Sequence, residues 1–474
     1  MFGVRRTPQL VIRARLVMIR RVETLPYESA PPADTREATF AQKAAWVMYD
    51  WANSGYGLIV IGPVFAPFFI KVLLPPLSEG SDEHGLTLGS TVIRASAITA
   101  VLTSMSMALM AVGAPMLGAI ADIKGWTKRL LITFATIGSL LTMAMIVLRP
   151  GQWVLGGTLY VLSNFCFGTS LAFANAYLPR LTRPERQGSL SGWGFAAGYV
   201  GGAVALIIVL VMISTWPNDP RVVAAGLALS GAWWILFSLP AFFLLDEFPP
   251  MATDVDRSGS LITAGFRRVK NTFVHLKRYR TLFLFLLAFL LYNDGVETVI
   301  AMAGSFGTDY LKMSDEKLIV MFLIVQFVAF GGALVFGYVS DRIGNKRVIL
   351  INLIVWLIAT FLALMTRPEP LFTVFGITFD GTNQFIALGV LIGLVLGGVQ
   401  AASRSLMAAL TPKEIHNEAF GFFSMSGKFA SIFGPLLYGG LVMGTGNPRW
   451  GILSVPPFLI GGLIVLLMVR EPRK

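Results

Sequence analysis

The sequence predicts an all-α membrane protein with twelve transmembrane helices arranged as two six-helix halves, and three observations support this fold class. Hydrophobic residues make up 55% of the 474-residue chain and charged residues only 14%, whereas a soluble domain has roughly a quarter charged residues. Apolar runs of about 20 residues, the length that crosses a hydrocarbon core of ~30 Å, recur along the chain. Short motifs of the first half also return in the second half.

The twelve apolar runs give the expected membrane spans in order. They lie near 46–74, 95–120, 130–148, 152–178, 189–214, 222–245, 281–303, 318–339, 348–366, 384–409, 418–443 and 450–469. Glycine is abundant, with 48 residues, which suits helices that pack closely through small side chains.

Loop charge predicts the orientation of these spans, because Lys and Arg concentrate on the cytoplasmic side. With the N-terminus inside, the inner segments hold 28 of the 38 basic residues and the outer loops hold six. Both termini are therefore expected in the cytoplasm. The net charge of +12 follows from this asymmetry and from attraction to anionic lipid head groups. We therefore do not interpret it as a nucleic-acid-binding surface.

The expected domain boundaries follow from the spans. They are 1–44 for a basic N-terminal extension without fixed structure, 45–245 for the first six-helix bundle, 246–280 for a cytoplasmic linker and 281–474 for the second bundle. The extension lacks the apolar core of a secretory signal peptide. Alternatives to an extension without fixed structure are a helix on the membrane surface, a targeting segment, or a true start of the protein at Met18. The linker stretch LITAGFRRVKNTFVHLKRYR predicts an amphipathic helix on the inner leaflet.

Two loop motifs at equivalent places show that the halves are parallel repeats. GAIADIKGWTKR follows the second span, and GYVSDRIGNKR follows the eighth. The acid of each motif can accept hydrogen bonds from a neighbouring helix N-terminus, and its bases can pair with acids or helix C-terminal carbonyls. In the first copy Ile123 replaces a basic residue, so we expect a weaker contact there. The motif residues are Gly118, Asp122, Gly125, Lys128, Arg129, Gly337, Asp341, Arg342, Gly344, Lys346 and Arg347.

The second motif copy resembles the loop signature of the major facilitator superfamily, in which it is thought to latch the cytoplasmic gate. The stretches YDWANS, NAYLP, SGWGFAAGY, LYNDG, QAASRS and FGFFSMSGKF further resemble the vacuolar amino-acid effluxer family associated with autophagy in fungi, whose bacterial members have been called the unknown major facilitator family. The resemblance covers about nine tenths of the chain. It implies a secondary transporter of neutral amino acids, and a bacterial inner membrane location.

Polar residues inside the apolar runs are the candidate substrate- or proton-binding groups. A charge near the bilayer centre costs at least ~2.5–3.5 kcal/mol, so such groups usually face a partner or a water-filled path. In the superfamily, helices 1, 4, 7 and 10 line the central cavity, and helix 11 is a neighbour. The candidates are Asp50, Asn53, Asn175, Asn293, Asp294, Glu297, Gln400, Arg404 and Lys428.

Depth separates these candidates into two layers. Asp294 and Glu297 share one helix face at mid-membrane, and Lys428 lies at comparable depth. Asp50 and Arg404 lie nearer the cytoplasmic side, where they pair with each other or each has a closer partner. For every one of these groups, a static ion pair or a packing hydrogen bond is the alternative interpretation.

The coupling chemistry is constrained by the positions of the histidines. His84, His275 and His416 all fall in loops or at their edges, so a buried carboxylate is the candidate proton carrier. Our hypothesis places the proton on Glu297 or Asp294, with Lys428 as a modulating partner.

The sequence argues against several other classes. It contains no Cys or His cluster with metal spacing, no GxSxG and no P-loop. We therefore do not expect an enzyme, and we expect the protein to bind no metal, no cofactor and no ATP. A channel is disfavoured because two repeated halves suit rocking about a central site. The expected partners are a small solute, protons and lipid, for a monomeric carrier. A sugar, peptide, drug or lysolipid remains an alternative substrate to a neutral amino acid or related zwitterion.

Overall fold

The computed structural model describes residues 37–78, 83–88, 91–250, 260–274, 279–370, 373–374, 377–378 and 380–472. The chain divides into two compact units, Met1–Glu37 and Ala38–Lys474. All the described helices and strands belong to the second unit. Most of the expected extension, residues 1–36, and the histidine at 275 lie outside the described residues.

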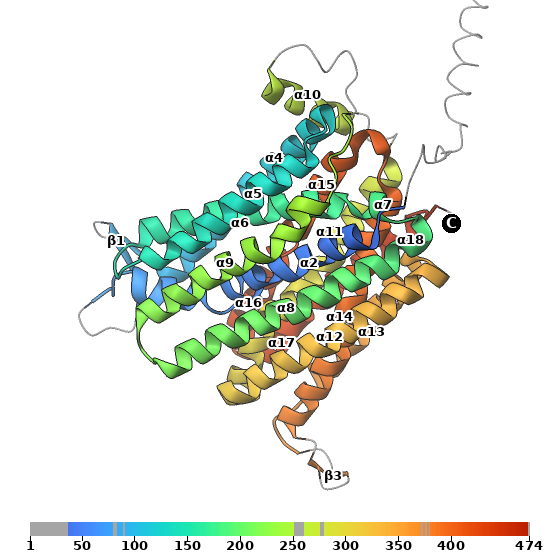
Figure 1. Ribbon diagram of the computed structural model, residues 1–474. Coiled ribbons are helices and arrows are strands. Elements are labelled where there is room, and N and C mark those ends of the chain that lie inside the picture. The colour runs from blue at the N-terminus through green and yellow to red at the C-terminus, as the bar shows by residue number, and fades with distance from the viewer. Residues whose placement is uncertain are drawn as a thin grey trace, which may run out of the picture. The chain divides into compact units, whose positions relative to one another are not determined.

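Helices run through almost all of this unit, and two short antiparallel hairpins lie in its loops (Figure 1). In chain order the elements are α2 (Phe40–Tyr56), the π-helix Gly57–Ile61, α3 (Phe65–Phe68), the π-helix Phe69–Leu73, β1 (Gly85–Leu88), β2 (Thr91–Arg94), α4 (Ala95–Lys124), α5 (Thr127–Met143), the 3-10 turn Ala144–Val147, α6 (Trp153–Ala176), α7 (Leu178–Leu181), the 3-10 turn Pro184–Arg186, α8 (Gln187–Thr215), α9 (Pro220–Leu244), α10 (Leu261–Val274), α11 (Arg280–Ser305), the π-helix Phe306–Tyr310, α12 (Asp315–Ile343), α13 (Asn345–Met365), β3 (Thr373–Val374), β4 (Ile377–Thr378), α14 (Gly381–Leu410), the 3-10 turn Lys413–Ile415, α15 (His416–Phe429), α16 (Phe433–Thr445), α17 (Pro448–Gly451), the 3-10 turn Ile452–Ser454 and α18 (Val455–Met468).

All twelve predicted apolar runs fall on helices. Among the described residues, 11 helical segments are long and apolar enough to cross a membrane. The remaining span, the eleventh in chain order, consists of α15 and α16, whose helices of 14 and 13 residues are each too short alone. A break at 430–432 divides this span, which hydropathy does not reveal because the residues on both sides remain apolar.

The first helix begins earlier than the sequence boundary at residue 45. The Thr39 side chain accepts a hydrogen bond from the backbone N–H of Gln42, and the Gln42 side chain accepts one in return from the backbone N–H of Thr39. This reciprocal capping box starts α2 at Phe40. Residues 40–44, which we assigned to the extension, are therefore helical.

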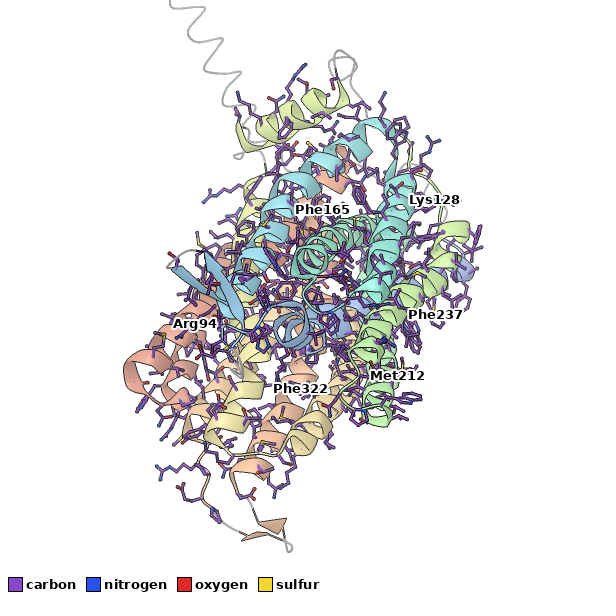
Figure 2. All side chains as sticks on the ribbon, turned by 90° about the vertical axis from the view of Figure 1, so that its left-hand side faces the viewer. Arg94, Lys128, Phe165, Met212, Phe237 and Phe322 are labelled. Carbon is purple, nitrogen blue, oxygen red and sulfur yellow. The ribbon has the colours of Figure 1, made fainter. Side chains whose placement is uncertain are left out.

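The two halves meet closely at the end of the bundle that carries both loop motifs, which we call the motif end. The contact runs between α4 and α15 and between α8 and α12. A Cβ added at Gly337 would lie 2.7 Å from the carbonyl oxygen of Gly188 and 3.0 Å from the Cα of Gly192. Figure 2 labels Lys128, at the motif end, and Arg94, which precedes the opposite end of α4.

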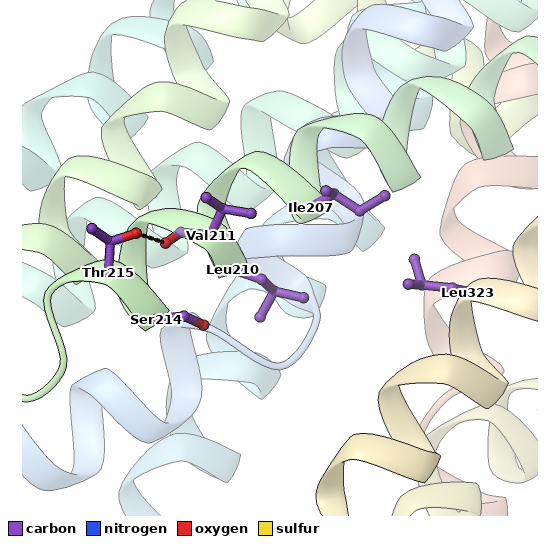
Figure 3. Close-up of a pocket in the computed structure, with 6 residues that line it drawn as sticks. All are labelled: Ile207, Leu210, Val211, Ser214, Thr215 and Leu323. Atoms are coloured by element: carbon purple, nitrogen blue, oxygen red, sulfur yellow. Dashed lines mark hydrogen bonds between the residues drawn. The ribbon is translucent and has the colours of Figure 1, made fainter.

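At the opposite end, which we call the far end, α8 and α12 are separated by a groove. Its volume is 410 Å³, and Leu323 of α12 faces the α8 side chains across it (Figure 3). The lining residues are Ile207, Leu210, Val211, Ser214, Thr215 and Leu323. The same helix pair is thus tightly packed at the motif end and parted at the far end.

The linker forms a helix, α10, that packs against the protein and is not an isolated surface element. A Cβ added at Gly265 would lie 3.1 Å from Ile120 Cγ1 and 3.3 Å from the Met116 carbonyl oxygen. Contact with α4 therefore holds α10 at the motif end.

Candidate functional site

A buried ion pair joins the two halves near the motif end. Arg404 of α14 donates to Asp50 of α2 across 2.6 Å, and the two side chains are 2% and 9% exposed. The same guanidinium donates to Asn175 of α6 at 3.2 Å and to both the hydroxyl and the carbonyl oxygen of Ser191 of α8, at 3.0 and 2.8 Å. Arg404 therefore ties one helix of the second half to three helices of the first.

Two aromatic rings complete the surroundings of this guanidinium. The Arg404 carbon Cζ lies 4.6 Å from the Trp46 ring centroid and 4.2 Å from that of Phe195. A Cβ at Gly194 would collide with the Asp50 carboxylate and the guanidinium, so glycine leaves the space that the pair occupies. We name this group the Arg404 cluster; its members are Trp46, Asp50, Asn175, Ser191, Phe195 and Arg404.

The acids of the two loop motifs each cap a helix of the opposite half. Asp122 accepts hydrogen bonds from the backbone N–H groups of Asn417 and Glu418 and from the Asn417 side chain, at 2.8 to 3.1 Å. Asp341 accepts from the backbone N–H groups of Gly188 and Ser189 and from the Ser189 hydroxyl, at 2.5 to 3.0 Å. Negative charge at a helix N-terminus is favourable.

The two acid contacts obey the same pseudo-symmetry as the sequence repeat. Each acid accepts three hydrogen bonds at the start of the helix that faces it. The weaker contact expected for the first copy is therefore not visible at its acid.

Two further acids, which the sequence analysis missed, stabilise the loops themselves. Glu247, after α9, accepts from the backbone N–H groups of Lys128 and Arg129 at 2.6 and 3.2 Å. Glu471, after α18, accepts from those of Asn345 and Lys346 at 2.8 and 3.1 Å. A sequence signal for these two acids exists: each half ends in an acid followed closely by proline, EFPP at 247–250 and EP at 471–472.

Glycine and lysine of the motifs also have defined contacts. Gly125 and Gly344 have φ angles of +68° and +97°, a region that side chains disfavour. Lys346 donates to the carbonyl oxygens of Leu467 and Val469 at the C-terminal end of α18. Arg342 instead lies over Tyr338 of its own helix, with Cζ 4.4 Å from the ring centroid.

A second polar group lies deeper in the bundle, next to the break in the eleventh span. Glu297 of α11 and Lys428 of α15 interact electrostatically, and both side chains are partly exposed. Asn293 lies close to Glu297; its side chain donates to the carbonyl oxygen of Gly427 at 3.4 Å and accepts from Gln400 of α14 at 3.1 Å. Four of the predicted site residues are thus brought together on three helices of the second half.

The first half contributes aromatic rings to this deeper group. The Lys428 ammonium nitrogen lies 5.2 Å from the Phe167 ring centroid of α6, within cation–π range. Tyr199 of α8 lies near both Glu297 and Arg404. We name this group the interior site; its members are Phe167, Tyr199, Asn293, Glu297, Gln400 and Lys428.

The remaining predicted residues have local structural contacts. Asn53 donates to the carbonyl oxygen of Tyr49 one turn earlier in α2, at 2.8 Å. Asp294 Oδ1 accepts from the backbone N–H of Gly434 at 2.8 Å, whereas its Oδ2 is buried without a hydrogen-bond partner among the described residues. Asp294 therefore caps α16 where the eleventh span restarts.

This cap makes a stability prediction. The variant Asp294→Ala loses the acceptor for Gly434, and a lost N-terminal cap costs about 0.5–2 kcal/mol. We expect a lower unfolding temperature for this variant by scanning fluorimetry in detergent. Asp294→Asn should lose less, because its amide oxygen still accepts. Equal unfolding temperatures for the wild type and Asp294→Ala would contradict this role.

The described histidines agree with the expected positions. His84 lies in a loop, and His416 is the first residue of α15, where its ring contacts the carbonyl oxygen of Ala176. No group of three or more His, Cys, Asp or Glu side chains arranged to hold a metal ion occurs in the part of the chain that the structure describes.

Comparison with known proteins identifies the family. The model of the "Vacuole effluxer Atg22 like" family matches residues 39–474. The "Uncharacterized MFS-type transporter YxiO" of Bacillus subtilis is 30% identical over 91% of this chain and 95% of the relative. Autophagy-related protein 22 of Saccharomyces cerevisiae is 26% identical over 85% of this chain and 84% of the relative.

Solved structures share the fold. The proton:xylose symporter XylE superposes with a TM-score of 0.68 at 11% identity, over 91% of this chain and 96% of that one. The transporter FucP in its outward conformation superposes with a TM-score of 0.63 at 12% identity, over 91% and 99% of the two chains. The chain is therefore a membrane transporter of the major facilitator type, with twelve transmembrane helices in two six-helix bundles, and it belongs to the vacuole effluxer Atg22-like family.

Proposed function

We propose that this protein is a secondary active transporter that moves a neutral amino acid or related zwitterion together with a proton by alternating access. The observation that carries the proposal is the interior site. It holds an acid and a base, Glu297 and Lys428, within electrostatic range of each other inside two of the membrane spans, where ionised groups are costly and usually functional. It also lies beside a discontinuous helix, a feature that marks binding sites in many transporters.

The chemistry of the interior site suits a zwitterion. Lys428 faces the substrate carboxylate, while oxygens of Glu297 and Gln400 accept from the substrate ammonium. Phe167 and Tyr199 form an apolar and aromatic wall that favours an uncharged substrate side chain. Asn293, fixed by its hydrogen bonds with Gln400 and Gly427, lines the site close to Glu297.

A proton on Glu297 couples to substrate binding through Lys428. When Glu297 is ionised, its charge holds the Lys428 ammonium. Protonation removes that attraction and frees Lys428 for the carboxylate of the substrate. The protonated carboxyl retains an oxygen that accepts from the ammonium, so proton and substrate occupy the site together.

The Arg404 cluster and the two acid contacts serve as the gate at the motif end. We place this end in the cytoplasm, following the excess of basic residues in its loops, and the protein in a bacterial inner membrane as a monomer. With the motif end closed and α8 and α12 parted at the far end, we interpret this conformation as an outward-facing state. Transport requires release of the Asp50–Arg404 pair and of both helix caps.

A ligand screen on the purified protein tests the substrate class. A ligand that binds the folded state raises its unfolding temperature according to its occupancy. We expect neutral amino acids to stabilise the wild type, and peptides, sugars and lysolipids not to do so. Lys428→Met should abolish the shift, whereas Lys317→Met, which removes an exposed lysine of α12, should retain it. If peptides, sugars or lysolipids raised the unfolding temperature and neutral amino acids did not, the proposed amino-acid substrate would be wrong.

A further inference from the structure

The linker helix α10 presents two different faces. Its inner face carries Ala264, Gly265, Arg268 and Thr272, which are buried or half-buried. Its outer face carries three exposed apolar side chains, Ile262, Phe266 and Val274, at 58%, 49% and 68% exposure. Two basic residues, Arg267 and Lys270, are exposed on the same outer face.

The inner face of α10 connects the two halves. Gly265 packs on α4 of the first half. Arg268 lies 3.7 Å from the fully buried carboxylate of Glu418 in α15 of the second half and donates to the carbonyl oxygen of Glu414. Thr272, on the same face of α10, lies close to this carboxylate. The backbone N–H of Glu418 is itself a donor to Asp122, so α10 reinforces the first acid contact of the gate.

The position of α10 along α4 gives its depth in the bundle. The helix contacts α4 at Met116 and Ile120, and α4 ends at Lys124. At about 1.5 Å per residue, this contact lies roughly 6–12 Å inside the end of a membrane-spanning helix. An apolar face with interspersed basic residues at this depth matches the boundary between acyl chains and anionic head groups.

We propose that α10 is a docking surface for anionic phospholipid of the adjacent leaflet, and that lipid bound there stabilises the closed state of the motif end. Ile262, Phe266 and Val274 enter the acyl boundary, while Arg267 and Lys270 meet lipid phosphates. Because Arg268 on the other face holds Glu418, lipid that retains α10 against the membrane also opposes separation of α4 and α15.

Fluorescence in proteoliposomes tests the docking directly and needs no knowledge of the substrate. In a Cys166→Ala background, Thr263→Cys on the outer face carries an environment-sensitive label. We expect a blue-shifted emission when phosphatidylglycerol is added to phosphatidylcholine vesicles. Arg267→Gln with Lys270→Gln should lose the shift, whereas Arg183→Gln with Lys413→Gln, which removes two exposed basic residues elsewhere at this end, should keep it. An emission that ignores phosphatidylglycerol, or an equal loss in both double variants, would overturn the proposal.

Spin-label distances test the consequence for the gate. Labels at Lys124→Cys of α4 and Ile343→Cys of α12 report the separation of the halves at the motif end. Phosphatidylglycerol should enlarge the short-distance population in the wild-type background. Arg268→Gln should cancel this effect while leaving the fluorescence shift of the labelled outer face intact. Unchanged distances on adding phosphatidylglycerol to the wild type would refute the link between lipid and gate, even if amino-acid binding were confirmed.

Discussion

Replacing Arg404 by Gln is expected to lower the free energy of unfolding by about 3–5 kcal/mol, because removal of one partner leaves a buried charge uncompensated. Asp50 is the group left without its partner: it is buried, and among the described residues only Arg404 donates a charged hydrogen bond to it. Asn175 and Ser191 lose their contacts with the guanidinium at the same time. Chemical unfolding of the purified protein in detergent measures the loss.

A double variant separates the charge effect from a general loss of packing. Asp50→Asn combined with Arg404→Gln removes both charges, so a substantial part of the lost stability should return. The Arg404→Gln single variant should also populate a state open at the motif end, where water reaches Asp50. A double variant as unstable as the sum of the two single variants would show that the ion pair is not the source of the effect.

Replacing Gly337 by Ala is expected to open the motif end. The added Cβ would lie 2.7 Å from the backbone carbonyl oxygen of Gly188 and 3.0 Å from the Gly192 Cα, and backbone atoms cannot rotate away. Overpacking of this kind costs about 1–3 kcal/mol, and here the cost falls only on the state in which α8 and α12 touch. The spin-label distance between positions 124 and 343 should therefore shift to longer values.

The matched control lies in the same helix. A Cβ added at Gly331 of α12 would meet no atom of the described residues within 4 Å, so Gly331→Ala should leave the distance distribution unchanged. Both substitutions raise helix propensity equally. If the two variants gave the same distribution, the close approach of the halves at Gly337 would not control the gate.

The sequence predicted the helices and the repeat because both are properties of local composition. A membrane span needs an apolar run of fixed length, and a duplicated half repeats its loop motifs. The pairing of Asp50 with Arg404 was foreseen as one of two options, because both residues lie at the same depth. The sequence predicted that Asp341 would accept hydrogen bonds from a helix N-terminus. It did not predict that this helix begins at Gly188, because the sequence does not reveal which helix N-terminus faces Asp341.

Other features depend on contacts that a linear pattern does not contain. The break at 430–432 has apolar residues on both sides, and its cap, Asp294, comes from another helix. Sequence reasoning treated Asp294 and Glu297 as equivalent because they share a helix face. In the structure one turn of α11 gives them different neighbours: Asp294 meets the backbone of Gly434, and Glu297 meets Asn293 and Lys428.

The central claim is that Glu297 carries the proton that moves with the substrate. Proteoliposomes that contain the wild type or Glu297→Gln test it most directly, with a labelled neutral amino acid and an imposed pH gradient. Because Gln resembles the protonated acid, the variant should still exchange labelled for unlabelled substrate but should not accumulate it in response to the gradient. Accumulation by Glu297→Gln equal to that of the wild type would contradict the account.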